Sequence, residues 1–257
     1  MACMLLAGGC ASQEAQDTTK HKLESGYAAL EQQRYGEAIS ASDEILAANP
    51  TGLGAAEALY LRGRAFEGRI KLNNASEASD LQVARTAYLQ ALQLPISPQL
   101  EGRVRAGIGL VAYYQDDYAT ALSQWTAAYD KLEKPEDQAL TLYRIGQTDQ
   151  RLGRWVDADR ALATVQQQAN GTDLAYMARR LQGSRAFYVQ VAKTGTSRDA
   201  LGVIAQLKQE GFPATTVQDA GEAAYQYVRV GPLPAYAQAK AVKIRLAYLY
   251  PQAVIVP

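Results

Sequence analysis

Histidine and cysteine are nearly absent from this sequence of 257 residues, and their scarcity excludes several kinds of active site. The one histidine is His21, and the two cysteines, Cys3 and Cys10, lie within the first ten residues. Ser-His-Asp and Cys-His nucleophiles and histidine-based metal sites need a histidine beside the reacting atoms. A disulfide framework or a thiolate metal site needs cysteines that the body of the chain lacks. We therefore expect no catalytic residues, no metal and no cofactor.

An excess of charge of either sign is also missing, because 26 basic side chains balance 26 acidic ones. A neutral chain argues against nucleic acid as the main partner. The charges are unevenly distributed, since the segment from Arg185 to the end contains eight basic and four acidic residues. This asymmetry and the chain length favour two domains.

No long apolar run is present at the N-terminus, where a bilayer span would need about 20 residues. The short run Met4–Gly9 ends in small residues and is followed by Cys10, a pattern typical of a secretory signal. It resembles the lipobox of bacterial lipoproteins, which implies that residues 1–10 are a lipoprotein signal and that Cys10 carries a lipid anchor in the membrane. An ordinary N-terminus is the alternative. Residues 11–22 are polar and are expected to form a flexible tether.

One pattern recurs within residues 23–183: a glycine is followed 12 residues later by an alanine, with an aromatic residue three positions before that alanine. A further copy, which contains Gly63 and Ala84, is stretched by an insertion near residues 73–76. The three regular copies are Gly26/Tyr35/Ala38, Gly109/Tyr118/Ala121 and Gly146/Trp155/Ala158.

These positions resemble the tetratricopeptide repeat (TPR), a helix-turn-helix unit of about 34 residues in which small residues let two helices cross closely. The resemblance implies a TPR-like α-solenoid over 23–183, closed by a helix at about 172–182, that recruits an unidentified envelope or divisome protein. Gly107-x-Gly109-x-x-Ala112 also fits a dinucleotide-binding fingerprint, but no buried strand precedes it. We expect these glycines to serve helix packing.

After Gly183 the apolar period changes from that of a helix to that of a strand. Strands are predicted at 187–191, 214–217, 225–230 and 253–256, with one helix capped by Ser197 and closed by Gly211 and another over 235–248. Gly231-Pro232 is expected to end the third strand. The order βαββαβ predicts a four-stranded sheet with both helices on one face, a ferredoxin/RNP-like arrangement. The fold class is therefore a helical solenoid over 23–183 followed by a small α/β domain over 185–257.

Strand alternation predicts which side chains point away from those two helices. Aromatic rings with polar tips beside an amide and a guanidinium suit sugar rings or bases. Cross-strand tyrosine pairs that only stabilise the sheet account for the pattern equally well. The outward residues are Tyr188, Gln190, Tyr225, Tyr227 and Arg229.

The segments FYVQV at 187–191 and YVRVGP at 227–232, Ala239 and the closing AVIV resemble the sporulation-related repeat (SPOR) domain. The resemblance implies that the open sheet face binds septal peptidoglycan, as glycan strands stripped of stem peptides. Gln190 would be among the binding positions, and Tyr225, Tyr227 and Arg229 would supply the aromatic and basic positions of the third strand. An RNA-recognition module shares the strand order but needs more basic charge, so no nucleic acid partner is expected.

Together the resemblances predict a non-enzymatic, lipid-anchored protein on the periplasmic side of the envelope, at the outer membrane and at the septum. The alternative is a scaffold of an outer-membrane assembly or secretion complex, with the C-terminal domain as a wall tether. A wall hydrolase would need two carboxylates across a sugar. The acidic residues of the C-terminal domain, all expected in helices or loops away from the open face, are Asp199, Glu210, Asp219 and Glu222.

Overall fold

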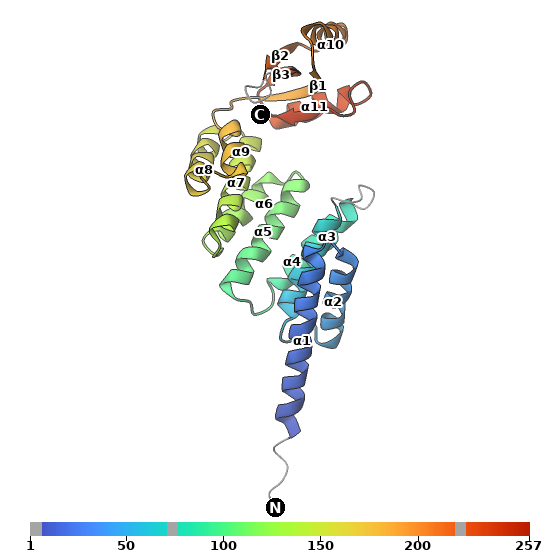
Figure 1. Ribbon diagram of the computed structural model, residues 1–257, viewed down its shortest axis with the longest axis vertical. Coiled ribbons are helices and arrows are strands. Elements are labelled where there is room, and N and C mark those ends of the chain that lie inside the picture. The colour runs from blue at the N-terminus through green and yellow to red at the C-terminus, as the bar shows by residue number, and fades with distance from the viewer. Residues whose placement is uncertain (1–6, 71–76, 219–224) are drawn as a thin grey trace, which may run out of the picture. The chain divides into compact units, whose positions relative to one another are not determined.

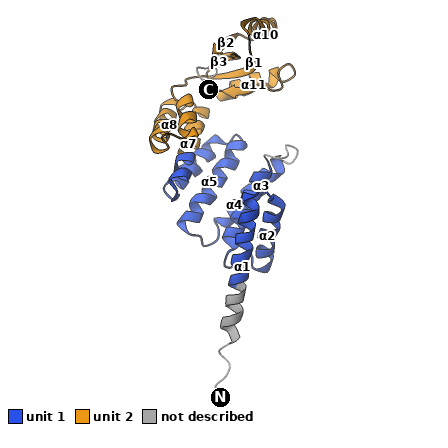
Figure 2. Ribbon diagram, in the orientation of Figure 1, with its two compact units in different colours: residues 1–141 blue, residues 142–257 orange. Residues whose placement is uncertain are grey.

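The computed structural model describes residues 7–70, 77–218 and 225–257 and divides into two compact units, Met1–Thr141 and Leu142–Pro257 (Figures 1 and 2). A helical region comes first in the chain and a small α/β domain with a four-stranded sheet comes last. The predicted fold class is confirmed at this level. The unit boundary falls within a helix rather than at residue 183, so each unit is considered separately.

The first unit consists of consecutive helices joined by short turns (Figure 1). Two of these helices begin with side-chain caps: Ser97 Oγ accepts a hydrogen bond from Leu100 N, and an Asp117 carboxylate oxygen accepts one from Thr120 N. Such caps satisfy backbone N–H groups that have no partner within the helix. The helices are α1 (Ala7–Glu31), α2 (Tyr35–Ala48), α3 (Ala55–Arg69), α4 (Glu77–Ala91), α5 (Pro98–Tyr114), α6 (Tyr118–Tyr129) and the start of α7 (Pro135–Arg151).

Glycine and alanine of the repeat pattern lie at close helix contacts. Ala38 and Ala121 have no exposed surface. A Cβ atom at Gly109 would lie 2.6 Å from the indole nitrogen of Trp125, and one at Gly107 would lie 2.6 Å from the ring of Tyr88. Both glycines stand inside α5, with no strand before them. The packing prediction for the apparent dinucleotide fingerprint is therefore confirmed.

The N-terminal segment differs from its prediction. Residues 11–22, expected to be a flexible tether, lie within α1, so that expectation was wrong about their conformation. The segment is rich in Ala, Gln, Glu and Lys, which favour helix, and it continues into a helix whose Leu23 is buried. Residues 1–6, the side chain of Cys10 and the insertion at 71–76 lie outside what the structure describes.

The second unit joins the last helices to the sheet. All strand pairs are antiparallel, in the order β2-β3-β1-β4. Val189 and Val228, which face the helices, pack with Leu207 of α10 and with Ala239 and Leu246 of α11 in one apolar core. The elements are the end of α7, α8 (Trp155–Gln168), α9 (Asp173–Leu181), β1 (Phe187–Thr194), α10 (Ser197–Gln209), β2 (Ala214–Gln218), β3 (Gln226–Leu233), α11 (Tyr236–Leu246) and β4 (Val254–Val256).

Two predicted boundaries in this domain were wrong. The N-cap of α10 is Thr196, not Ser197, because the Thr196 hydroxyl accepts a hydrogen bond from Asp199 N at 3.1 Å. Gly231-Pro232 does not end β3, because the strand continues to Leu233, which pairs with Phe187.

Candidate functional site

The sheet face opposite α10 and α11 carries a hydrogen-bonded pair in its two central strands. Gln190 of β1 and Arg229 of β3 are register partners, and Arg229 Nε donates to Gln190 Oε1 at 3.1 Å. Their neighbours in sequence, Val189 and Val230, are buried on the helix side. Strand alternation therefore places the amide and the guanidinium together on the open face, as predicted.

Tyr188 lies on the same face as Gln190, at the start of β1. Its register partner is Val256 of β4. Its ring lies against Gly231, where a Cβ atom would come within 2.9 Å of the Tyr188 ring. Gly231 also has a φ of 139°, a backbone conformation that L side chains rarely adopt. The glycine therefore makes room for the tyrosine ring beside it.

Lys193 is a residue of this face that the sequence pattern does not predict. The register between β1 and β3 shifts between Gln190 and Ala192, so both Val191 and Ala192 contact the core and the alternation then reverses. Lys193 thereby becomes the partner of Tyr227. No sequence signal of strand alternation could reveal this, because simple alternation assigns Lys193 to the core side.

The lysine, two tyrosines and the arginine form a row of cations and rings. Lys193 Nζ lies 4.2 Å from the ring centroid of Tyr225 and 5.6 Å from that of Tyr227. Arg229 Cζ lies 5.9 Å from the Tyr227 ring. Tyr225 itself immediately precedes β3 and is 43% exposed. Four of the five predicted residues therefore lie on the open face, and the fifth, Tyr225, lies just before the first residue of β3.

The described acidic residues of this domain lie on the helix side. Asp199 Oδ2 accepts a hydrogen bond from Thr196 at the start of α10, and Glu210 Oε2 accepts one from Tyr248 at its end. Asp219 and Glu222 fall outside the described residues. Within those residues, no three His, Cys, Asp or Glu side chains are grouped so that they could hold a metal ion. The described part of the open face therefore presents cations, amides and rings rather than carboxylates.

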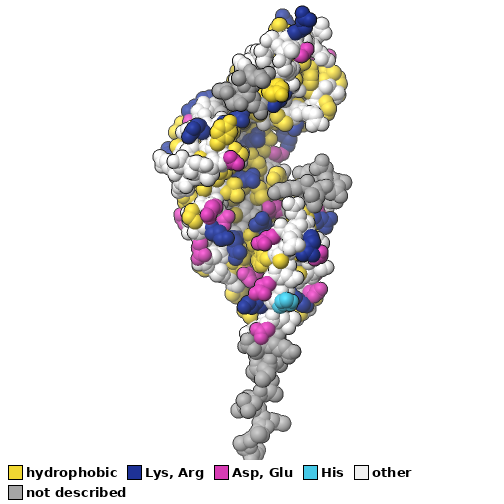
Figure 3. Space-filling view, in the orientation of Figure 1, with side chains coloured by type: hydrophobic (Ala, Val, Ile, Leu, Met, Phe, Trp, Pro, Cys, Tyr) yellow, Lys and Arg dark blue, Asp and Glu magenta, His cyan; other side chains and the backbone are white. Residues whose placement is uncertain are grey.

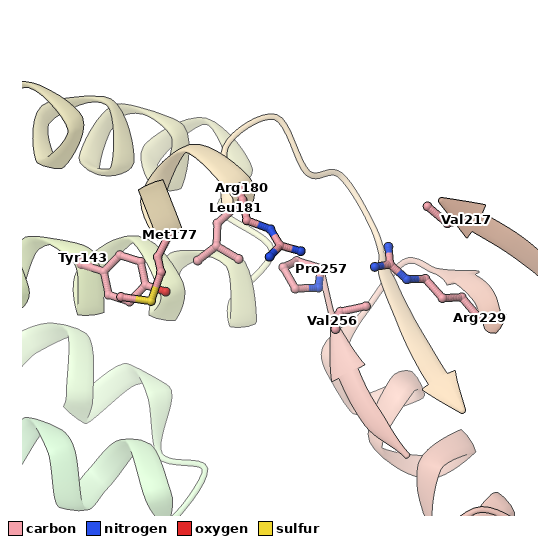
Figure 4. A pocket seen from close by; sticks show the side chains of 8 residues that line it. All are labelled: Tyr143, Met177, Arg180, Leu181, Val217, Arg229, Val256 and Pro257. Atoms are coloured by element: carbon pink, nitrogen blue, oxygen red, sulfur yellow. The ribbon is translucent and has the colours of Figure 1, made fainter. Parts of the chain in front are cut away.

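A cleft of about 420 Å³ extends the open face towards the preceding helices (Figure 4). Arg229 and Arg180 both line it, and Figure 4 shows their guanidinium groups directed into the space around Pro257. Its full lining is Tyr143 of α7, Met177, Arg180 and Leu181 of α9, Val217 of β2, Arg229 of β3, Val256 of β4 and Pro257.

Contacts from α7 and α8 attach the sheet domain to the helices that precede it. Trp155 and Phe187 have ring centroids 5.1 Å apart, and Arg151 Cζ lies 3.7 Å from the ring centroid of Tyr236. Asp159 accepts hydrogen bonds through one carboxylate oxygen from Gly183 N at 2.8 Å and through the other from Arg185 Nη2 at 2.7 Å. The segment between α9 and β1 is thus attached to α8.

Comparison with known families identifies residues 183–257 as a SPOR domain, by a match to that family's model. No curated protein matches the chain. A SPOR domain is a non-catalytic peptidoglycan-binding domain of envelope proteins, often of proteins that act in cell division. No helix in the described residues is long and apolar enough to span a membrane.

Proposed function

We propose that this chain, whose residues 183–257 are a SPOR domain, is a non-enzymatic envelope protein that binds septal glycan strands stripped of stem peptides. The observation that carries the proposal is the hydrogen-bonded pair of Gln190 and Arg229 on the open sheet face, flanked by tyrosine rings. That face lies on the family-matched domain, opposite the helices.

The chemistry of the face suits a polar sugar chain. The amide of Gln190 can donate through Nε2 to hydroxyl or N-acetyl oxygens while its Oε1 accepts from Arg229. Tyr227 and Tyr188 offer flat apolar area with a polar tip, which fits pyranose rings. Lys193 and Arg229 add hydrogen-bond donors that carry charge, and these make stronger hydrogen bonds than neutral donors.

The helices of residues 23–183 would recruit a protein partner to the site of binding. Support comes from their likeness to TPR units, including the buried Ala121 at a helix contact. Basic and acidic side chains are interspersed on the face visible in Figure 3. Such a mixture favours binding to a specific protein over nonspecific binding to a partner that carries charge of one sign. The lipobox-like sequence before Cys10 supports a lipid anchor, which would place the protein at the outer membrane.

Co-sedimentation of the full chain with purified sacculi tests the glycan proposal. Gln190→Ala should weaken binding several-fold, because a lost hydrogen bond in a bound site costs about 0.5–1.5 kcal/mol. Gln238→Ala is the matched control, since Gln238 is exposed on α11 at the opposite side of the sheet. If Gln190→Ala binds sacculi as strongly as wild type does, and its circular dichroism spectrum is unchanged, the open face is not the binding site.

The same two variants, expressed as fluorescent fusions, extend the test to the cell. Wild type and Gln238→Ala should form a band at the division site, and Gln190→Ala should lose it. A uniform peripheral signal from the wild type would contradict septal binding and favour the scaffold alternative.

A further inference from the structure

The cleft beside the open face brings together two arginines from separate parts of the fold. Arg180 comes from α9, in the helical region, and Arg229 comes from β3 of the sheet. Arg229 directs Nε to Gln190, and Figure 4 shows its terminal nitrogens turned towards the cleft. Arg180 approaches the same space from the opposite wall (Figure 4).

The remaining lining is largely apolar, and this combination restricts the ligand. Met177 is 43% exposed and Val217 is 36% exposed, so apolar surface is accessible on both walls. Guanidinium groups make strong, charge-assisted hydrogen bonds to carboxylates. The cleft is therefore suited to a molecule that has both negative charges and apolar faces.

A glycan strand without stem peptides has both properties. In peptidoglycan the peptide is joined by an amide bond to the lactyl carboxyl group of every second sugar. Removal of the peptide leaves a free carboxylate at that position, while the pyranose rings keep their apolar faces. Two arginines in one cleft would favour such a strand over one whose carboxyl groups are in amide linkage.

We propose that α9 and α7 form a second wall of the glycan site, in which Arg180 and Arg229 bind the carboxylates of a peptide-free strand. This inference rests on the proposed function and adds to it a residue outside the sheet that determines specificity. Tyr143, whose hydroxyl accepts a hydrogen bond from Gln147 at 3.2 Å, lines the helical side with Met177.

Binding of the full chain to amidase-treated glycan strands tests the second wall. Arg180→Gln should weaken binding about tenfold, as expected for loss of a charge-assisted contact. Arg180→Lys, which keeps the charge but not the planar fork, should fall between this variant and wild type. Arg179→Gln is the matched control, because Arg179 is the adjacent exposed residue of α9 and does not line the cleft.

The same strands with their carboxylates converted to methylamides provide the decisive comparison. Wild type should bind them more weakly than Arg180→Gln binds the untreated strands, because both arginines lose their carboxylate partners. Wild type and Arg180→Gln should bind the methylamide strands about equally. Equal binding of the untreated strands by Arg180→Gln and wild type, or an equal loss in the Arg179 and Arg180 variants, would overturn the second wall.

The Gln190→Ala variant separates failure of this inference from failure of the proposed function. If Gln190→Ala weakens binding and Arg180→Gln does not, only the second wall is wrong. If wild type does not bind the strands at all, both proposals are wrong. Thermal unfolding of each variant, measured beside the binding, verifies that α9 remains folded.

Discussion

At the scale of single residues, Gly109 shows how the helical region depends on a missing side chain. A Cβ atom there would lie 2.6 Å from Trp125 Nε1, which donates a hydrogen bond to Ala106 O at 3.0 Å. Gly109→Ala should lower the free energy of unfolding by about 1–3 kcal/mol, because the indole has to move. Gly36→Ala, also in a helix but with open space around it, should be nearly neutral. Equal melting temperatures for the two variants would contradict the packing.

The residues of the open face could be predicted from the sequence only as far as the strand alternation is regular. Alternation correctly placed Tyr188, Gln190, Tyr227 and Arg229, because burial of one face fixes the parity of each strand. It failed at Lys193, because the irregularity after Gln190 adds a residue on the core side. Arg180 could not be predicted either, since its position beside the sheet depends on tertiary packing.

At the scale of elements, α7 carries a buried carboxylate that opposes stability at neutral pH. Asp149 is 4% exposed, and burial, with a smaller effect of Asp157, raises its pKa to about 6 although Arg154 lowers it. Between pH 4 and pH 6 the folded state therefore binds more protons than the unfolded state. The free energy of unfolding should accordingly fall as the pH rises through this interval.

Asp149→Asn should remove that pH dependence and raise the free energy of unfolding at pH 7 by about 1–2 kcal/mol. Urea unfolding of both proteins at several pH values measures the effect. Asp173→Asn, a change of the same kind at an exposed position in the first turn of α9, should give no such gain. A variant less stable than wild type at pH 7 would show that the carboxylate is stabilised rather than strained by its surroundings.

Element types were predictable, whereas several element ends were not. Apolar periodicity is a property of a whole segment, so it indicated the helical region and the order βαββαβ. Ends depend on single contacts: the Thr196 hydroxyl rather than that of Ser197 caps α10, and pairing with Phe187 extends β3 to Leu233. For α1, composition suggested a tether, but polar residues of high helix propensity continue the helix that Leu23 anchors.

At the scale of the whole molecule, the core of the SPOR domain is extended by a side chain of α8, the helix that begins at Trp155. Trp155 packs against that core and contacts Phe187. A fragment of residues 135–257 should therefore unfold at a higher temperature than one of residues 185–257. Trp155→Ala in the longer fragment should lower its free energy of unfolding by about 2 kcal/mol and remove most of the difference.

Val156→Ala provides the control for this comparison, because Val156 is the next residue of α8 and is 67% exposed. It should leave the melting temperature of the longer fragment nearly unchanged. If the two fragments melt at the same temperature, the contacts of α7 and α8 do not contribute to the stability of the sheet domain.

The bidentate attachment of Asp159 to Gly183 and Arg185 has a mechanical consequence. A force on β1 from a bound glycan would pass to α8 through these two hydrogen bonds as well as along the covalent segment between α9 and β1. The two hydrogen bonds therefore link the segment before β1 directly to α8, over a shorter path than the chain between Asp159 and Gly183 provides. A protein partner bound to α8 and α9 would accordingly move together with the SPOR domain and with the glycan that this domain binds.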